Sequence, residues 1–234
     1  IVADEITVNA GAGGIGNFAV VVSPLQDITV SGDVTLNGGG SAPTPTAGGA
    51  ALIGGGNTFP TNLSLTVGGN LTLNGGHVVN SGASLGNGLT GLQPTEITLN
   101  VGGNVTLNPG TATGARIGSA LANPLGGDIV VNAGGTIALN SAAPGLAGAI
   151  RTADNVTLRA QSFTQRSEAL IRANALRVET THGALLAGTN TVNSLGAVNS
   201  ASGDVAFNNA SALLTVTGID QVPQGALSLN QSGN

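Results

Sequence analysis

Apolar and polar residues alternate along this chain in short runs that return at regular intervals. Four copies are plain: ITVSGDVTLN, LTVGGNLTLN, LNVGGNVTLN and VNAGGTIALN, at residues 28–37, 65–74, 99–108 and 131–140. Each copy holds two alternating runs joined by a glycine-centred turn, and alternation of period two is typical of β-strands. The copies begin 32 to 37 residues apart. A period built from strand pairs predicts a solenoid.

Stacking of the copies predicts a triangular parallel β-helix, in which each strand pairs with its equivalent about 4.8 Å away in the next coil. A weaker motif predicts a third short strand; it reads ALIG, ARIG, GAIR, ALIR and ALLAG, at 51–54, 115–118, 148–151, 169–172 and 184–188. We expect about eight coils of three short strands in a single unit over residues 1–234. Their first strands are expected to start near residues 6, 28, 63, 97, 129, 155, 175 and 203.

Period-two alternation also assigns the side chains to faces. One inward ladder of leucines is predicted, at Leu36, Leu73, Leu107, Leu139 and Leu158. A second is predicted at Val34, Leu71, Val105, Ile137 and Val156. An asparagine follows most of these leucines, and Asn suits turns and can hydrogen-bond along a stack. We therefore predict a structural asparagine ladder at Asn37, Asn74, Asn108 and Asn140.

Composition limits which residues can form the core and how strongly the surface is charged. Aromatic residues are 2% of the chain, all of them Phe, so the core must be thin and built from Val, Ile, Leu and Ala. Charged residues are only 7%, against roughly 25% in a typical soluble domain. Six scattered arginines do not make a nucleic-acid footprint. The absence of Cys excludes disulfides, and no apolar run is long enough to span a membrane.

Carboxylates recur just before the expected first strands, at Glu5, Asp27, Glu96, Asp128 and Asp154, with Asn62 in the remaining place. If they stack, neighbours about 4.8 Å apart repel by roughly 1 kcal/mol in water, which a Ca²⁺ ion would relieve. The calcium-repeat consensus GGxGxDx is absent, however. We favour a solvated polar corner and expect no cofactor, with Glu96, Asp128 and Asp154 as the remaining Ca²⁺ candidates.

Catalysis would need clustered or paired carboxylates with an acid or base. The best local constellation is Arg177, Glu179 and His182 in RVETTHG, with Glu168 and Arg172 nearby. Alternation puts Arg177 and Glu179 on one outer face, which is also where a surface ion pair would lie. No Tyr or Trp is present to stack on a sugar. We therefore expect no enzyme activity.

Two further surface features are interpreted structurally. Outward threonines recur at Thr35, Thr72, Thr106 and Thr157, but Ala138 breaks the row, which makes it too irregular for ice binding. Six N-x-S/T glycosylation sequons occur. A chain so rich in Asn, Ser and Thr generates such sequons by chance, so we interpret them as structural residues.

The motifs VGGNLTLN, VGGNVTLN, NAGGTIALN and SGDVAFN resemble the haemagglutinin-type repeats of two-partner-secreted bacterial adhesins, the filamentous haemagglutinin family. The resemblance implies a right-handed parallel β-helix, export across the outer membrane to the cell surface, and adhesion or matrix roles without catalysis. The NPNL and NPNGI motifs of that family's secretion domain are absent. The segment therefore resembles the shaft of a longer protein.

The sequence thus predicts an adhesive, structural shaft of an exported bacterial surface protein or extracellular fibre. Expected partners are a host-cell or matrix surface, or copies of the chain joined through open β-helix ends, with no nucleic acid and no membrane span. Long loops between residues 38 and 128, above all 38–62 and 80–96, are expected to carry binding, and coils 151–182 are more charged. The alternative is a polysaccharide-binding or polysaccharide-cleaving β-helix, favoured by a groove with three convergent carboxylates.

Overall fold

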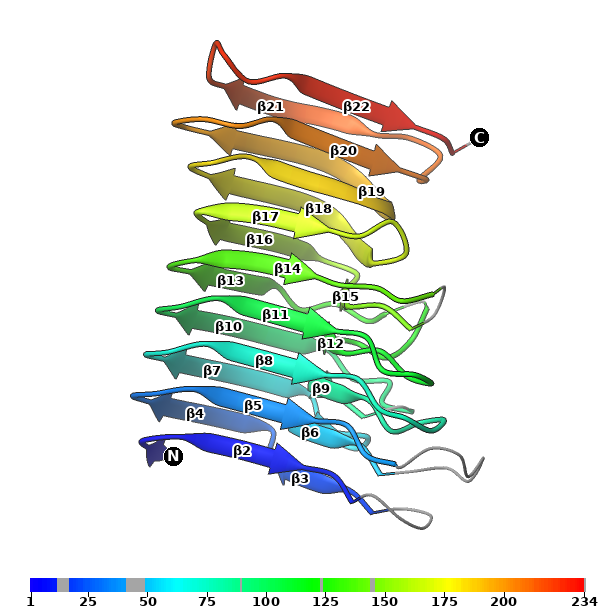
Figure 1. Ribbon diagram of the computed structural model, residues 1–234. Coiled ribbons are helices and arrows are strands. Elements are labelled where there is room, and N and C mark those ends of the chain that lie inside the picture. Colours follow the sequence, from blue (N-terminus) through cyan, green and yellow to red (C-terminus); the bar gives the residue numbers. More distant parts are fainter. Residues whose placement is uncertain (12–16, 41–48, 89, 123, 144–145, 234) are drawn as a thin grey trace.

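The computed structural model describes residues 1–11, 17–40, 49–88, 90–122, 124–143 and 146–233. These residues form parallel strands and no helix, wound as a column of coils from the N-terminus at the bottom to the C-terminus at the top (Figure 1). The near strands run left to right and the far strands right to left while the chain rises, so the winding is right-handed. The predicted right-handed parallel β-helix is confirmed.

Each coil contributes a first strand, and these pair in register to form the first stack. Its separate strands are β1 (Val2–Ala3), β4 (Leu25–Val30), β7 (Thr61–Val67), β10 (Thr95–Val101), β13 (Ile129–Ala133), β16 (Asn155–Ala160) and β21 (Thr215–Gln221). Between β16 and β21 lie the ends of two longer strands, β18 (Leu170–Thr180) and β19 (Ala184–Asn199).

The second stack follows a turn in every coil, and most of these turns contain glycine. It consists of β2 (Ile6–Asn9), β5 (Val34–Asn37), β8 (Leu71–Asn74), β11 (Val105–Asn108), β14 (Thr136–Leu139), β17 (Ser162–Gln165), the start of β19, β20 (Val205–Asn209) and β22 (Leu227–Gln231). These nine strands agree with the expectation of roughly eight coils and a partial ninth from Ala226, which is β22.

The third stack closes the triangle. It consists of β3 (Ala19–Val22), β6 (Ala51–Gly56), β9 (Ala83–Asn87), β12 (Arg116–Gly118), β15 (Ala149–Arg151), the start of β18 and the middle of β19. The predicted ALLAG strand at 184–188 is wrong, because β19 begins there in the second stack, and β9 was missed. The expectation of three short strands per coil also fails at β19, which runs through all three stacks.

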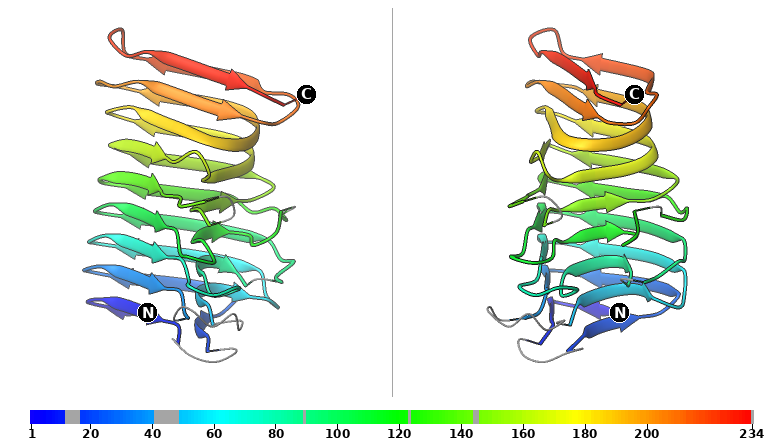
Figure 2. Two further views of the ribbon diagram at one scale, coloured as in Figure 1. Left: turned by 45° about the vertical axis from the view of Figure 1, so that its right-hand side comes forward. Right: turned by 90° about the vertical axis from the view of Figure 1, so that its right-hand side faces the viewer.

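Coil length decreases towards the C-terminus. Paired residues of the second stack are 37 apart at Val34 and Leu71, but 21 apart at Phe163 and Ala184. The C-terminal coils are correspondingly plain in outline, and the longer connections lie in the N-terminal half (Figure 2). Residues 41–48 and 89 of the two loops expected to carry binding lie outside the described residues.

The inward ladders are confirmed for four coils and change their residues at the fifth. Leu36, Leu73, Leu107 and Leu139 pair in sequence and are completely buried. Leu158 does not continue them: it pairs with Val131 in the first stack, and Gln165 takes the predicted position. Likewise Phe163 and not Val156 follows Ile137. The VTL sequence of β16 resembles that of the second-stack strands, but β16 belongs to the first stack.

The same confusion affected the predicted coil starts. Strands near Ile6 and Gly203 were expected to be first strands, yet β2 and β20 belong to the second stack. First strands begin instead at Val2 and, within β19, at Ser194. Both strand types alternate and both precede a polar corner, so alternation alone does not distinguish them.

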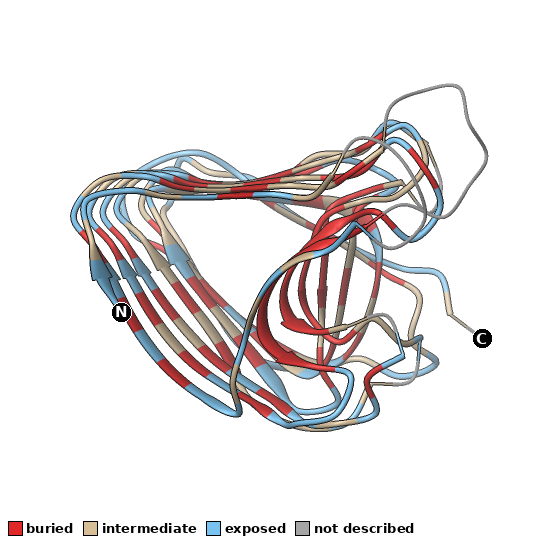
Figure 3. Cartoon of the chain, turned by 90° about the horizontal axis from the view of Figure 1, so that it is seen from below, coloured by how far each residue is buried: buried red, intermediate tan, exposed pale blue. Residues whose placement is uncertain are grey.

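One continuous apolar core runs from Val8 to Phe207. Burial alternates along the first stack, whereas β6, β9 and β12 are buried on both faces, because connecting segments cover their outer side (Figure 3). Parallel strands buried on both sides are normally near-continuously apolar. Here small residues and glycines replace bulky ones, which leaves room for the covering segments.

Candidate functional site

The acidic edge contains Glu96 and Asp128 side by side, and one oxygen of each carboxylate already accepts a hydrogen bond. Glu96 Oε2 accepts a hydrogen bond from the Asp128 backbone N–H at 2.9 Å, and Asp128 Oδ1 accepts one from that of Asn155 at 3.2 Å. Asp154 lies one residue out of this row and accepts from the Gly127 N–H at 2.8 Å. Each carboxylate therefore binds the backbone of the adjacent coil.

The rest of the predicted acidic row does not form. Asp27 pairs with Ser64, two residues beyond the position of Asn62. Among the described residues, no three His, Asp or Glu side chains lie close enough together to hold a metal ion. The arrangement is that of a hydrogen-bonded corner.

The asparagines at the end of the second strands form a continuous side-chain ladder. Nδ2 of each donates to Oδ1 of the residue one coil below, at 2.6 to 2.9 Å. Its members are Asn9, Asn37, Asn74, Asn108 and Asn140. Asn9 extends the four predicted members, and the motif ITVN, which it ends, was the signal available in the sequence.

A second row of side chains links the turns between first and second strands. Asp33 Oδ1 accepts from the Asn70 backbone N–H at 2.7 Å, Asn70 Oδ1 from that of Asn104 at 2.9 Å, and Asn104 Oδ1 from that of Thr136 at 2.8 Å. The adjacent glycines permit this stacking: a Cβ on Gly102 would lie 2.4 Å from the Gly68 carbonyl oxygen. The conspicuous GGN turns are therefore structural.

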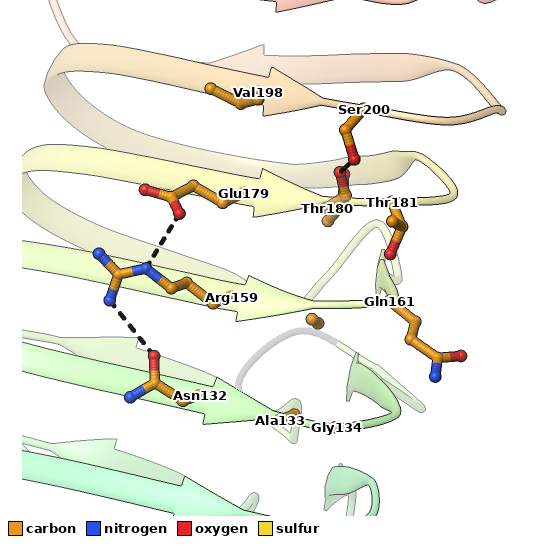
Figure 4. Close-up of a pocket in the computed structure, with 11 residues that line it drawn as sticks. Asn132, Ala133, Gly134, Arg159, Gln161, Glu179, Thr180, Thr181, Val198 and Ser200 are labelled. Carbon is orange, nitrogen blue, oxygen red and sulfur yellow. Dashed lines mark hydrogen bonds and ion pairs between the residues drawn. The ribbon is translucent and has the colours of Figure 1, made fainter.

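A shallow depression on the outer face of the first stack contains an ion-paired cluster (Figure 4). It has a volume of about 570 Å³. Its lining residues are Asn132, Ala133, Gly134, Arg159, Ala160, Gln161, Glu179, Thr180, Thr181, Val198 and Ser200. Glu179 is the one carboxylate among them, so the paired carboxylates of common glycosidases are not assembled here.

Successive coils position the charged side chains of this depression in one outward row. Asn132, Arg159 and Glu179 are register neighbours on β13, β16 and β18. Arg159 Nη1 donates to Asn132 Oδ1 at 3.3 Å, and its Nε donates to Glu179 Oε2 at 3.0 Å. Arg177 donates to the other carboxylate oxygen of Glu179. The hydrogen bond from Arg177 is the main cause that lowers the pKa of Glu179; burial opposes it, and the hydrogen bond and charge of Arg159 lower the pKa further.

His182 does not join Arg177 and Glu179. It lies in the turn that follows β18, where its Nδ1 is 3.0 Å from Ser202 Oγ of the next coil. His77 is similarly 3.1 Å from Thr111 Oγ1. The predicted trio is thus an ion pair with a separate turn histidine, and it provides no acid–base pair.

Sequence reasoning missed the polar groups buried inside the column. Gln165 and Asn190 exchange two side-chain hydrogen bonds, 2.8 and 3.1 Å, and Asn209 binds both backbone groups of Val192. All three are buried. They satisfy the backbone where the short C-terminal coils turn without a loop. Their inward position in the alternation was the available signal.

The chain matches no protein-family model, no curated protein and no solved structure among those compared with it. Its resemblance to haemagglutinin-type repeats therefore rests on the short motifs alone. The part of the chain that the structure describes contains no helix long and apolar enough to cross a membrane.

Proposed function

We propose that this chain is a shaft segment of an exported bacterial surface protein or extracellular fibre, with a structural and adhesive role and no catalytic one. The observation that carries the proposal is where the polar side chains direct their hydrogen bonds. At the corners and turns they bind the next coil, as in the ladder that includes Asn74 and the row that starts at Asp33. Such rows stiffen a column and leave few groups for a ligand.

Adhesion is supported by the unequal coils. A repetitive column tolerates insertions in its connections, and these are where function usually resides. In the described part of the chain, the long connections lie between the second and third stacks and after the third, in the N-terminal half. The candidate partners are a host-cell or matrix surface, or other copies of the chain.

Cell attachment and enzyme assays on the purified 234-residue chain test this proposal together. We expect beads coated with the chain to attach to host cells or matrix. Shortening the 90–94 segment should reduce attachment, and a matched change in the tight turn at 200–203 should not. Turnover of acidic or neutral polysaccharides that disappears in Glu179→Gln would overturn the proposal.

The depression of Figure 4 favours a second candidate, polysaccharide binding without cleavage. It offers amide, hydroxyl, guanidinium and carboxylate groups on a wide, open face, which suits a hydroxyl-rich chain. A glycan array tests it: a bound glycan should be lost in Gln161→Ala and retained in Thr106→Ala, which changes the outer face of another coil. Equal binding by both variants would exclude the depression.

A further inference from the structure

A second cavity, on the outer side of the third stack, has a different character from the open depression. It has a volume of about 540 Å³, within the range of small-molecule sites. It is lined by Phe18, Val20, Val22, Ala50, Leu52, Gly55, Gly56, Asn57, Thr58, Phe59, Asn80, Ser84, Gly88, Thr90 and Arg116. One side is apolar, and a single charged group is present.

The apolar side exposes two phenylalanines, a residue type that the chain otherwise buries. Phe18 and Phe59 are 56% and 46% exposed, whereas the other two phenylalanines, Phe163 and Phe207, are each 1% exposed in the core. Val20, on β3, is also half-exposed. Half of the aromatic side chains of the molecule therefore line one cavity, where water contacts them.

The charged group is Arg116, which is 9% exposed. One of its terminal nitrogens donates to the Asn87 carbonyl oxygen, while its Nε is buried without a hydrogen-bond partner. No Asp or Glu is among the described residues that line this cavity, so no carboxylate of the lining neutralises Arg116. Burial and the charge of Arg151 lower the pKa of Arg116 to about 10. A buried cation without a counterion is costly, and an anion would relieve that cost.

The register orders these groups along the column. Val20 pairs with Leu52, Leu52 with Ser84, and Ser84 with Arg116. Three strand spacings separate the first from the last, about 14 Å. The lining therefore changes from apolar to cationic along the axis, over a distance that matches an extended amphiphile.

Glycines allow the coils of the third stack to approach one another closely beside this cavity. Gly54, Gly86 and Gly118 occupy equivalent positions on β6, β9 and β12, all with positive φ. A Cβ on Gly54 would lie 2.0 Å from the Gly86 carbonyl oxygen. A larger residue at these positions would therefore collide with the backbone of the next coil.

We propose that this cavity binds an amphiphile with an apolar body and one anionic head, such as a medium-chain fatty acid. The body lies against Phe18, Phe59 and the β3 valines, and the head pairs with Arg116. This inference goes beyond the shaft proposal and is independent of it, since a shaft can carry a ligand at one coil.

Phenylalanine-selective NMR with decanoate below its micelle concentration tests the site, because the core rings serve as internal controls. Decanoate should shift the Phe18 and Phe59 signals and leave those of Phe163 and Phe207 unchanged. Decanol, which has the same body and no charge, should bind about tenfold more weakly, the difference expected for a charge-assisted hydrogen bond. Acetate should produce no shift.

Two variants assign the head and the body. Arg116→Gln, which retains an N–H donor for Asn87, should bind decanoate and decanol equally, and Arg177→Gln on another face should keep the tenfold preference. Phe18→Ala, at an exposed position, should weaken both ligands alike. Shifts of all four rings, equal affinity for both ligands in the native chain, or a preference that survives Arg116→Gln would overturn the proposal.

Discussion

At the scale of single residues, stability in this column depends on side chains that act in two coils at once. Asn74 donates to Asn37 and accepts from Asn108, at 2.6 and 2.8 Å. Asn140 is at the end of the same ladder and only donates within it. The same residue type therefore has unequal effects at two positions.

Replacing Asn74 by Ala should cost about 1–3 kcal/mol of unfolding free energy, because two hydrogen bonds are lost. Asn140→Ala should cost about half as much, since one bond is lost. Urea unfolding of both variants measures the difference. Equal losses of unfolding free energy in the two variants would contradict the expectation that the number of ladder hydrogen bonds sets the cost.

Inward and outward neighbours provide a second contrast. Leu107 is completely buried, and Thr106 beside it is partly exposed on the outer face. Leu107→Asp should destabilise the column by at least about 3 kcal/mol, through a lost apolar contact and a buried charge. Thr106→Asp should have a small effect on the melting temperature. Comparable losses in both variants would contradict the assigned faces.

Glu179 predicts a pH dependence. Its pKa is lowered from the ordinary value of 4.5, chiefly by the hydrogen bond from Arg177. A carboxylate with a lowered pKa in the folded state stabilises above its ordinary pKa, and that stabilisation is lost as pH falls through the lowered value. Native chain and Glu179→Gln should differ at pH 7 by about 0.2–1 kcal/mol, as for a surface pair.

Thermal unfolding between pH 7 and pH 2 checks this expectation, and the difference should vanish at the acidic end. Glu96→Gln serves as the matched control, because Glu96 contacts no arginine and accepts from a backbone N–H. A difference that persists unchanged at low pH would rule out the ion pair as its cause.

At the scale of elements, the sequence predicted strands more securely than their place in the coil. The sequence pattern was sufficient to place Leu73 and Leu107 in the second stack, because a GGN turn precedes the strand of each. The VTL of β16 and the VAF of β20 were assigned to the wrong stack because first and second strands alternate alike, although the SGD turn before β20 also precedes β5, a second strand. Arg116 was missed because burial of a charge on the outer side of a strand depends on segments that cover it from elsewhere.

The acidic edge is an element-scale feature with its own prediction. Since Glu96 and Asp128 accept backbone N–H groups from the adjacent coil, chelation of divalent ions should leave the melting temperature unchanged. A fall of several degrees with EDTA, abolished when both residues are replaced by Asn, would establish a cation site. Scanning calorimetry with and without EDTA makes the measurement.

At the scale of the whole molecule, stability is the sum of coils and of contacts between neighbouring coils. Each central coil has a partner on both sides, and the terminal ones have one. The side chains of β22 are exposed along its whole length. In β8 and β11, buried and partly buried side chains alternate. The fold class follows from the repeat, but the gradient of stability follows only from the stacked column.

Hydrogen exchange of the 234-residue chain should therefore show a gradient. Amides of β8, β11 and β14 should exchange slowest, and those of β1 and β22 fastest, because the terminal strands open without breaking the core. Mass spectrometry of exchanged peptides resolves these segments. Uniform protection from end to end would indicate a single cooperative unit.

The asparagine ladder also gives the column a direction. In this ladder, each Nδ2 donates to the asparagine of the coil on its N-terminal side. Asn9 is the first member, so its Nδ2 has no acceptor within the ladder. A coil placed below must offer an acceptor at that corner, as another asparagine in the same orientation would. If two columns met through their N-terminal coils, the Asn9 amide donor of one would face the same donor of the other. If copies of the chain stack end to end, the direction of these side-chain amides favours head-to-tail assembly over two-fold pairing of the N-terminal coils.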